Sequence, residues 1–597
     1  MNILGVAAYF HDSSASLIIN NEIIAAVQEE RFSRKKNDAD FPIKSIEYCI
    51  LEGKIDAKDL DAIVFYEKPF LKFERIIESY IENAPLNLYA FSKNMPKWIK
   101  QKLFMKREII QKFDESYPDI DWSKTQLLFS KHHLSHAASS FFVSPFEEAA
   151  ILTIDGVGEH ATATISKGIG NSIEALKELN YPHSLGLFYS AFTSFLGFEV
   201  NNGEYKVMGL APYASGNNED VEKLIQILKN NLIFISETGS IRLNTSYFQF
   251  NNSKSMLKIK KVEQLLNMNA ISNTSSFSTP HLNLAQAIQQ ITEEVLLKMV
   301  QYTKHLFPSE NLCLAGGLAL NCVANGKIKE SSVFKNIFIQ PAAGDAGGSL
   351  GAALAAYYLH FKKPRIVSDN MMKNALLGPS FSESEISKAL TKKNMVFEKV
   401  SAENKITLAT EFLLNGKTIG WFQGRMEFGP RALGNRSIIA NPLLAETQST
   451  LNLKVKKRES FRPFAPVILE DEFELYFGQK YASPYMLFAH KLKDEFRKPF
   501  NLNSNLIESI NQNRSPFPAV THVDFSSRIQ TVNDDSNPEL FRLLVNFKSK
   551  TGFGILVNTS FNIKDEPIVC TPMDAINCFV NTEIDILILD NFIVRKN

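Results

Sequence analysis

A histidine-rich segment, KHHLSHAASSFF at 131–142, supplies the first residues whose spacing suggests chemistry. Residues four apart on a helix share a face, so His132 and His136 can point at one ion. Asp155 ends the apolar stretch AAILTID, and Asp345 lies in IQPAAGDAGGSL, at a strand-to-helix junction. Two imidazoles and two carboxylates without sulfur suit Fe(II), Zn or Mn better than a structural zinc. A helix with surface histidines would show the same spacing, so both interpretations stay open.

Two loops of small residues, LAGGLALNCVANGKI (314–328) and GDAGGSLGAAL (344–354), precede predicted helices. Backbone N–H groups at such junctions bind phosphate, helped by the helix dipole. Close packing of helix on strand produces the same composition and remains an alternative. The candidate nucleotide-binding residues in the N-terminal part are Asp12, Lys206, Gly316, Gly317, Asn321, Gly344 and Gly347.

The C-terminal part carries arginines and lysines in segments rich in Gly, Phe and Pro, which are too apolar to be wholly exposed. The planar fork of arginine donates two parallel hydrogen bonds to phosphate. We therefore expect a polyanion site, with a solvated basic face as the alternative. The candidates are Arg425, Arg431, Arg436, Lys456, Arg458, Arg462 and Arg528, with Asn558 and Ser560 as neutral donors.

These residues must be positioned by an α/β fold with a repeat in it. Residues 3–29 predict a strand, a polar turn and a strand pair, and 149–168 predict a second strand-turn-strand unit. An acid stands at the first turn of each unit, which suggests a duplicated fold. The periodic stretch 282–306 predicts a long helix. Segments 70–120 and 215–280 are expected to be a helical insertion and a loop-rich excursion.

The chain as a whole has the composition of an ordinary globular protein. Its 597 residues exceed what one hydrophobic core holds, so we expect at least two domains. The 65 basic residues nearly cancel the 64 acidic ones, which argues against nucleic-acid or membrane partners. Five scattered cysteines without a CxxC pair indicate neither a disulfide framework nor a thiolate zinc site. A cytoplasmic protein is expected.

Taken together, the motifs resemble the carbamoyltransferase family of nodulation-factor, cephamycin and aminoglycoside biosynthesis. The resemblance runs in order along nearly the whole chain. It is carried by ILGVAAYFHDSSASLI (3–18), KHHLSHAASSFF (131–142), LTIDGVGE (152–159), NNGEYKVMGLAPYA (201–214), CLAGGLALNCVAN (313–325), GWFQGRMEFGPRALGNRSI (420–438), KKRESFRPFAPVIL (456–469) and GILVNTSFNIKDEPIV (554–569).

The resemblance implies two domains. Residues 1–372 would form a duplicated domain of the actin-like ATPase superfamily, similar to the tRNA threonylcarbamoyl transferase subunit (Kae1-like). Residues 373–597 would form a YrdC-like α/β domain, similar to the threonylcarbamoyl-AMP synthase. It also implies that His132, His136, Asp155 and Asp345 hold the metal, with Fe(II) the ion that the family suggests.

The activity implied is an ATP-dependent O-carbamoyl transfer. ATP with Mg²⁺ and carbamoyl phosphate would give carbamoyl-adenylate in the C-terminal domain, and a small-molecule hydroxyl would take the carbamoyl group in the N-terminal one. An alcohol needs a general base at neutral pH, for which His11 is the candidate and His522 a weaker one. Lys206 would contact nucleotide or acceptor.

Two other functions remain open. An actin-like ATPase acting as a kinase or chaperone would share the hairpins and glycine loops, but needs neither the histidine pair nor the arginine-rich part. A tRNA-modifying enzyme of the threonylcarbamoyl type is disfavoured by the balanced charge. The identity of the acceptor is not encoded in a readable motif, and the oligomeric state, for which a homodimer is one option, is equally open.

Overall fold

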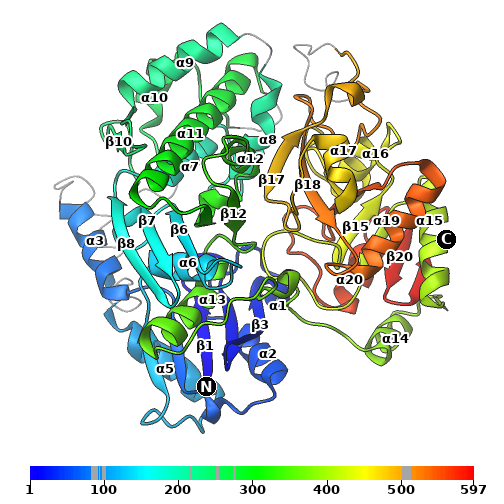
Figure 1. The fold of residues 1–597 in the computed structure, drawn as a ribbon, viewed down its shortest axis with the longest axis horizontal. Helices are drawn as coiled ribbons and strands as arrows, with labels where there is room; N and C mark the ends of the chain where they lie inside the picture. Colours follow the sequence, from blue (N-terminus) through cyan, green and yellow to red (C-terminus); the bar gives the residue numbers. More distant parts are fainter. Residues whose placement is uncertain are drawn as a thin grey trace.

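The structure is a computed structural model that describes residues 1–81, 92, 95–96, 103–214, 218–250, 255–272, 277–500 and 512–596. Two five-stranded sheets are built from the first part of the chain, and a nine-stranded sheet from the last part. Figure 1 shows these parts as two bodies side by side, blue to green on one side and yellow to red on the other.

The first sheet has the strand order β3-β2-β1-β4-β5. Its β1 pairs antiparallel with β2 and parallel with β4. The core faces of β1 are apolar and fully covered, as expected for a central strand with layers on both sides. The strands are β1 (Asn2–Ala7), β2 (Ser14–Ile19), β3 (Glu22–Gln28), β4 (Ala62–Phe65) and β5 (Gln126–Phe129).

The second sheet, of order β12-β11-β6-β7-β8, repeats this plan. Read from its other edge, its order is β8-β7-β6-β11-β12, which places the third, second, first, fourth and fifth strands of this sheet, counted along the chain, side by side, as in the first sheet. Its β6 pairs antiparallel with β7 and parallel with β11. The strands are β6 (Glu148–Ile154), β7 (Ala161–Ile169), β8 (Ser172–Asn180), β11 (Asn311–Ala315) and β12 (Asn336–Ile339). The predicted fold class, α/β with a duplicated N-terminal part, is confirmed.

Two helices made largely of small residues hold the repeats together: α6 (His132–Phe141) and α13 (Ala346–Ala355). They pack directly on each other and α13 also lies on β1. A Cβ at Gly351 would collide with the carbonyl oxygen of Ser135, and one at Gly5 with that of Ser349. The small residues of 344–354 therefore serve close helix packing, the alternative that the sequence left open.

The C-terminal sheet mixes parallel and antiparallel pairs in the order β13-β21-β20-β14-β15-β19-β16-β18-β17. This is the α/β part expected to be YrdC-like. Its strands are β13 (Glu398–Lys399), β14 (Ile419–Phe422), β15 (Arg436–Ala440), β16 (Ala465–Leu469), β17 (Phe488–Lys491), β18 (Ser526–Val532), β19 (Ile555–Ser560), β20 (Ile586–Leu589) and β21 (Phe592–Arg595).

Strand β17 lies against α12 (Cys322–Glu330), so the two halves are in direct contact, as Figure 1 also shows. The Asn325 amide donates to the carbonyl of Leu487 at 2.9 Å, and Gly326 lets the two backbones approach. A second contact is the hydrogen bond from the Tyr213 hydroxyl to the carbonyl of Phe461, at 2.8 Å. These contacts are buried, so they fix the halves relative to one another.

The long helix predicted at 282–306 is α11 (Thr279–Leu306). The excursion at 215–280 is more regular than expected: its described part holds α9 (Asn218–Asn231), the hairpin β9 (Ile233–Ile235) and β10 (Ile241–Leu243), and α10 (Ile259–Leu266). The loop prediction was wrong there because polar Asn and Ser flank amphipathic runs, of which α9 packs on α11 and α10 packs on α9.

In 70–120 the structure describes α3 (Pro69–Ile81) and α5 (Met105–Ser116), while most of the stretch between them lies outside the described residues. The predicted boundary at residue 372 falls between the N-terminal part and α14 (Glu383–Lys392), and it stays a prediction. Within the part of the chain that the structure describes, no helix is long and apolar enough to cross a membrane.

Candidate active site

Helix α6 presents His132 and His136 on one face, one turn apart. Their Nε2 atoms are 3.1 Å apart. The Glu159 carboxylate accepts from the backbone N–H of His132 at 2.9 Å, so a negative charge caps the positive end of α6. The helix start, and with it the first imidazole, is thereby fixed.

Two aspartates complete the cluster. Asp155 directly follows β6, and Asp345 directly precedes α13. The Nε2 atom of His132 is 3.0 Å from Asp155 Oδ2 and 3.6 Å from Asp345 Oδ1, and all four ligand atoms lie within 4.8 Å of one another. Helix α6 follows β5 of the first sheet, whereas β6 lies in the second sheet and α13 follows its strand β12, so the duplicated fold brings these residues together.

The four groups have the geometry that an ion requires. Donor atoms bound about 2.1 Å from one ion stand roughly 3 to 4 Å apart, as these do. All four side chains are buried, and Asp345 Oδ2 has no hydrogen-bond partner among the described residues. Although burial lowers it, hydrogen bonds to Asp155 and Asp345 raise the pKa of His136 to about 9. The two carboxylates thus demand a positive charge, which a divalent cation supplies.

The third histidine of the segment, His133, faces away from this cluster. Its Nε2–H donates to the carbonyl of Ala161 at 2.9 Å, so Nδ1 accepts from the Thr153 hydroxyl at 2.7 Å. Burial, followed by the charges of His132 and His136, lowers its pKa to about 3. His133 therefore ties α6 to the second sheet as a neutral, structural group.

His11 lies in the turn after β1, beside the cluster. Its Nδ1 is 3.0 Å from Asp12 Oδ2, and its Nε2 is 4.0 Å from Asp345 Oδ2. Burial lowers its pKa, but the charge of Asp345 and the hydrogen bond to Asp12 prevail and raise it to about 9. That charge of Asp345 is the one a bound cation would neutralise.

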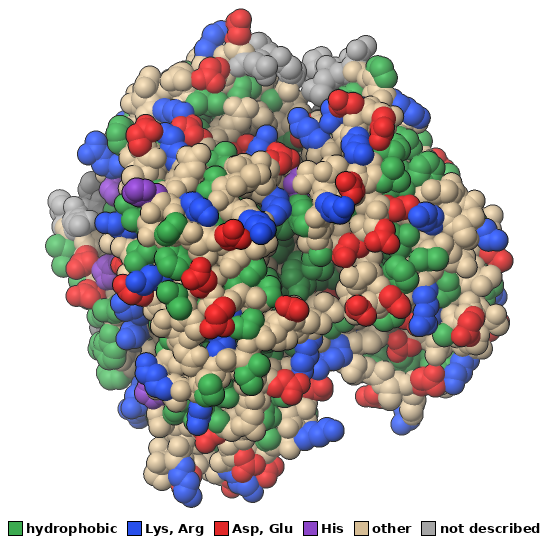
Figure 2. Space-filling model, viewed as in Figure 1, with side chains coloured by type: hydrophobic (Ala, Val, Ile, Leu, Met, Phe, Trp, Pro, Cys, Tyr) green, Lys and Arg blue, Asp and Glu red, His purple; other side chains and the backbone are tan. Residues whose placement is uncertain are grey.

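A cavity of about 490 Å³ lies between the two halves, and Figure 2 shows a hollow near the middle of this face. His132 and His136 do not line it, whereas the two aspartates that contact them do. The predicted residues that line it are His11, Asp12, Asp155, Lys206, Gly317, Asn321, Gly344, Asp345, Arg431, Lys456, Arg458, Arg462, Arg528, Asn558 and Ser560.

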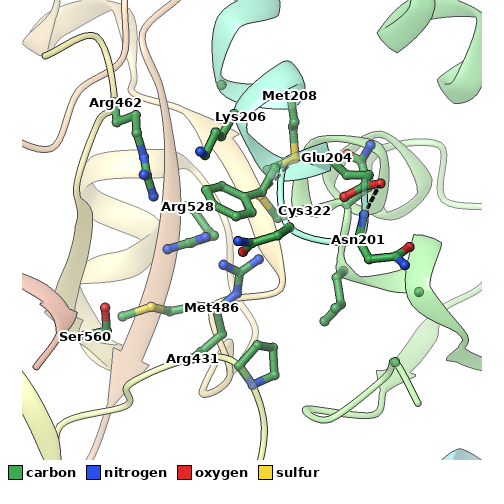
Figure 3. Close-up of a pocket in the computed structure, with 18 of the residues that line it drawn as sticks. Asn201, Glu204, Lys206, Met208, Cys322, Arg431, Arg462, Met486, Arg528 and Ser560 are labelled. Atoms are coloured by element: carbon green, nitrogen blue, oxygen red, sulfur yellow. Dashed lines mark hydrogen bonds between the residues drawn. The ribbon is translucent and has the colours of Figure 1, made fainter. Parts of the chain in front are cut away.

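The cations of this cavity have few counter-ions. Figure 3 shows Arg431, Arg462 and Arg528 turned toward the same space as Lys206 of α8 (Glu204–Leu210). Among the described residues, no carboxylate lies within 4.0 Å of Arg431, Lys456, Arg458 or Arg528 in an ion pair. Burial and the charge of Arg528 lower the pKa of Arg431 to about 9. Buried like charges held together in this way favour a polyanionic ligand.

Comparison with known proteins decides the family. The model described as Carbamoyltransferase N-terminus matches residues 2–354, and the one described as Carbamoyltransferase C-terminus matches residues 410–596. The chain belongs to the carbamoyltransferase family. The family resemblance drawn from the motifs is thereby confirmed, and the protein is a carbamoyltransferase.

Relatives of this carbamoyltransferase cover most of its length. An uncharacterised protein of Synechocystis sp. is 46% identical over 100% of this chain and 97% of its own. The nodulation protein NolNO of Sinorhizobium fredii is 32% identical over 98% of this chain and 79% of its own. The 3'-hydroxymethylcephem-O-carbamoyltransferase of Amycolatopsis lactamdurans is 25% identical over 75% of this chain and 76% of its own.

The glycines of the carbamoyltransferase divide by role. The Gly317 N–H donates to Asp155 Oδ1 at 3.0 Å, which orients that carboxylate. Gly316 has φ of 92°, and a Cβ there would collide with the carbonyl of Ile154. Gly347 packs against the carbonyl of Ala342. Gly316 and Gly347 do not line the cavity, so the structure assigns them to backbone packing rather than to nucleotide contact.

Two predicted arginines are also not brought to the cavity. Arg425 donates to the carbonyl oxygens of Leu377, Gly378 and Ile24, at 2.7 to 3.1 Å. Arg436 is fully buried, donates to several backbone carbonyls and lies over the ring of Phe422. Backbone carbonyls, and for Arg425 also the Glu52 carboxylate, already partner these guanidinium groups, so we propose a structural role for both arginines.

The remaining candidates are tied to specific partners. Lys456 Nζ contacts Ser560 Oγ at 3.1 Å and Asn562 Oδ1 at 2.9 Å. Asn321 caps α12 and exchanges hydrogen bonds with Gln289. The His522 ring donates from Nε2 to the carbonyl of Gly209 at 3.0 Å, so it links the halves at the cavity wall.

Sequence reasoning missed Lys36, Lys564 and Tyr205 as cavity residues. Both lysines stand in polar stretches that look like any exposed loop, and only their position in three dimensions distinguishes them. Tyr205 directly precedes Lys206, and the side chain of Arg462 lies 4.8 Å from its ring centroid. The apolar periodicity of GEYKVMGL predicts a helix but gives no sign of this contact.

A second, more polar cavity of about 560 Å³ adjoins the first. Side chains of one face of α11 line it: Gln286, Gln289, Gln290 and Glu293. Both cavities share wall residues, namely Met208, Pro212, Val323, Ala489 and Ser526. In the described part of 70–120 and 215–280, Val221 alone lines a cavity, and that cavity is the second one. We expected these two segments to shape the acceptor pocket, and this single contact gives that expectation little support.

Proposed function

We propose that this carbamoyltransferase uses ATP and carbamoyl phosphate to make carbamoyl-adenylate, and then transfers the carbamoyl group to a hydroxyl of a small molecule. The observation that supports this most is that one cavity is lined both by the cations of the C-terminal half and by Asp155 and Asp345, the two aspartates of the four-residue cluster. An adenylate made at one wall can reach the other without entering bulk water. That matters because carbamate and its adenylate decompose in water.

In the first half-reaction, water cleaves carbamoyl phosphate to carbamate and phosphate. A carbamate oxygen then attacks the α-phosphorus of ATP, and the bond to pyrophosphate breaks. Arg431, Arg458 and Arg528 bind and orient the phosphate groups, because buried guanidinium groups without counter-ions are pre-organised for oxyanions. Mg²⁺ accompanies ATP.

In the second half-reaction, the acceptor oxygen attacks the carbonyl carbon of carbamoyl-adenylate, and AMP leaves. His11, the proposed general base, takes the hydroxyl proton in its neutral form, and its imidazole faces the cavity next to Asp345. His132, His136, Asp155 and Asp345 would hold the metal ion, Fe(II) by the family resemblance and Zn or Mn by ligand type, and it would supply positive charge for the phosphate. Gly317 keeps Asp155 in place.

We assign the non-reacting part of the acceptor to the second cavity. Amide side chains both donate and accept, as hydroxyl groups do, and three glutamines of α11 line this space. Among the relatives, one is named for a hydroxymethylcephem acceptor and others for nodulation. We further propose that residues 1–372 perform the transfer and 373–597 form the adenylate.

The decisive experiment is incubation of the purified protein with ATP and carbamoyl phosphate, followed by measurement of pyrophosphate, AMP and ADP. The proposal requires pyrophosphate release that depends on carbamoyl phosphate. Formation of ADP instead would indicate a kinase-type ATPase, and release without carbamoyl phosphate would contradict the adenylate route. A filter-binding assay with tRNA at moderate salt separates the tRNA-modifying alternative.

A further inference from the structure

One acidic side chain lies inside the cationic wall of the cavity. Glu459 stands between the segment that holds Lys456 and strand β16, and 15% of its side chain is exposed. Its carboxylate is 3.7 Å from Lys206 Nζ, 3.5 Å from an Arg462 guanidinium nitrogen and 3.6 Å from Lys564 Nζ. One carboxylate therefore serves three cations, drawn from both halves of the protein.

No other carboxylate among the described residues pairs with this wall. The Lys and Arg residues that line the cavity are Lys36, Lys206, Arg431, Lys456, Arg458, Arg462, Arg528 and Lys564. Within 4.0 Å of any of them, Glu459 alone among the described residues supplies an acidic oxygen. Burial raises the pKa of Glu459, but a backbone hydrogen bond and the charges of Lys206, Arg462 and Lys564 outweigh it and lower the pKa to about 2. Glu459 is thus ionised whenever the protein is folded near neutral pH.

The three contacts are longer than those of a tight ion pair. Lys405 and Glu539, elsewhere in the C-terminal half, are 2.7 Å apart. Charge-assisted hydrogen bonds are typically about 2.7–2.9 Å long. At 3.5 to 3.7 Å, Glu459 balances the charge of its neighbours without forming the short hydrogen bonds that would hold it in place. Such a carboxylate can be displaced by a better anion.

We propose that Lys206, Arg462 and Lys564 form an oxyanion subsite that Glu459 occupies as an internal counter-ion until a phosphate group displaces it. A phosphate group carries more charge than a carboxylate and a third acceptor oxygen, so it can engage all three cations at once. All three cations line the cavity, and Lys564, with 42% of its side chain exposed, gives access from solvent. That the phosphate belongs to ATP or its pyrophosphate product rests on the proposed function.

The subsite also connects the two halves. Lys206 belongs to α8 of the N-terminal half, whereas Arg462 and Lys564 belong to the C-terminal half. The hydrogen bond from Tyr213 to Phe461 holds α8 and the Glu459 segment close together. Arrival of a phosphate therefore replaces an internal charge at the junction, and Glu459 sets how tightly that phosphate is held.

The test is the binding of inorganic pyrophosphate to the Glu459→Gln variant, measured by isothermal titration calorimetry at constant ionic strength without carbamoyl phosphate. Glutamine keeps the size and loses the charge. Pyrophosphate should bind roughly five- to tenfold more tightly than to the unchanged protein, because no internal anion competes. If Glu459 only held the cations in place, its replacement would weaken pyrophosphate binding. Binding that is weaker than or equal to that of the unchanged protein therefore overturns the proposal.

Glu583→Gln is the matched control. Glu583 pairs with Lys454 at 3.7 Å on the surface of the same half and lies outside the cavity. This variant should bind pyrophosphate as the unchanged protein does. Thermal melts of all variants establish that they fold.

Lys564→Gln keeps the proposal testable if Glu459→Gln does not fold. It should weaken pyrophosphate binding about fivefold, and equal binding would also overturn the proposal. These titrations involve no turnover, so their outcome does not depend on whether the proposed reaction is correct. If pyrophosphate release did not depend on carbamoyl phosphate, the proposed reaction would be contradicted. That result would not bear on the oxyanion subsite.

Discussion

His132 Nε2 and Asp155 Oδ2 are 3.0 Å apart although 23 residues separate them in the chain. The contact joins the first turn of α6 to the end of β6, and the Gly317 N–H holds the other oxygen of the same carboxylate. Hydrogen bonds within the protein therefore hold the cluster together, and its parts can be removed one at a time.

Replacing His136 by Ala should remove the bound metal. Its imidazole is one of four ligand groups, and loss of one leaves two carboxylates with a single imidazole. We expect metal content, measured by mass spectrometry of the purified protein, to fall from about one ion per chain to a small fraction of that.

His160→Ala is the control for this loss. The His160 ring is partly exposed and lies outside the cluster. Its variant should retain the metal, and retention of metal by His136→Ala would show that the cluster is not the metal site.

Replacing His133 by Ala should lower stability but leave the metal in place. The substitution removes two buried hydrogen bonds, to Thr153 and Ala161, and leaves a cavity under α6. The free energy of unfolding should fall by about 2–4 kcal/mol in urea titrations. A stable variant that has lost its metal would contradict the separation of roles between His133 and its neighbours.

Binding of ATP should weaken as the pH rises through the alkaline range. Burial first, and then the charge of Arg458, lowers the pKa of Lys456 well below its ordinary value. A bound phosphate favours the ammonium form of Lys456. The affinity for ATP is therefore at its maximum below the pKa that Lys456 has in the free protein, and it declines above that pKa. Calorimetric titrations with ATP at a series of pH values below about 10.4, the ordinary lysine pKa, measure this decline.

Lys456→Arg tests whether this lysine is responsible. The ordinary pKa of arginine is higher than that of lysine, so the decline should move to higher pH. Parallel decline in both proteins would assign the effect to another group.

Arg528→Gln and Arg425→Gln should behave in opposite ways. Arg528 lines the cavity without a carboxylate partner, so its loss should raise the KM for ATP roughly 10- to 100-fold with little effect on folding. Arg425 bonds to carbonyls of the connection between the halves, so its loss should lower the Tm and leave KM within about twofold. Assays of pyrophosphate release measure the KM, and thermal melts measure the Tm. A raised KM for ATP in Arg425→Gln would show that Arg425 belongs to the ATP site after all.

The chemical groups of this protein and the order of its strands and helices could largely be predicted from the amino-acid sequence. The alternation of apolar residues in 3–29 and 149–168 predicted both hairpins, and the i, i+4 spacing of His132 and His136 placed them on one face of a helix. These are local properties, because the helix and strand periods are set by the backbone. The motifs were specific enough to indicate the carbamoyltransferase family before any geometry was known.

Which basic residues face the cavity could not be predicted before the fold was known. Arg431 and Arg436 are five positions apart in one segment, yet the first lines the cavity and the second is buried among backbone carbonyls. The place of Glu459 among three cations was equally hidden, since its partners come from 206, 462 and 564. The physical reason is that a side chain's partners depend on how distant segments pack, and a local pattern carries no record of that packing.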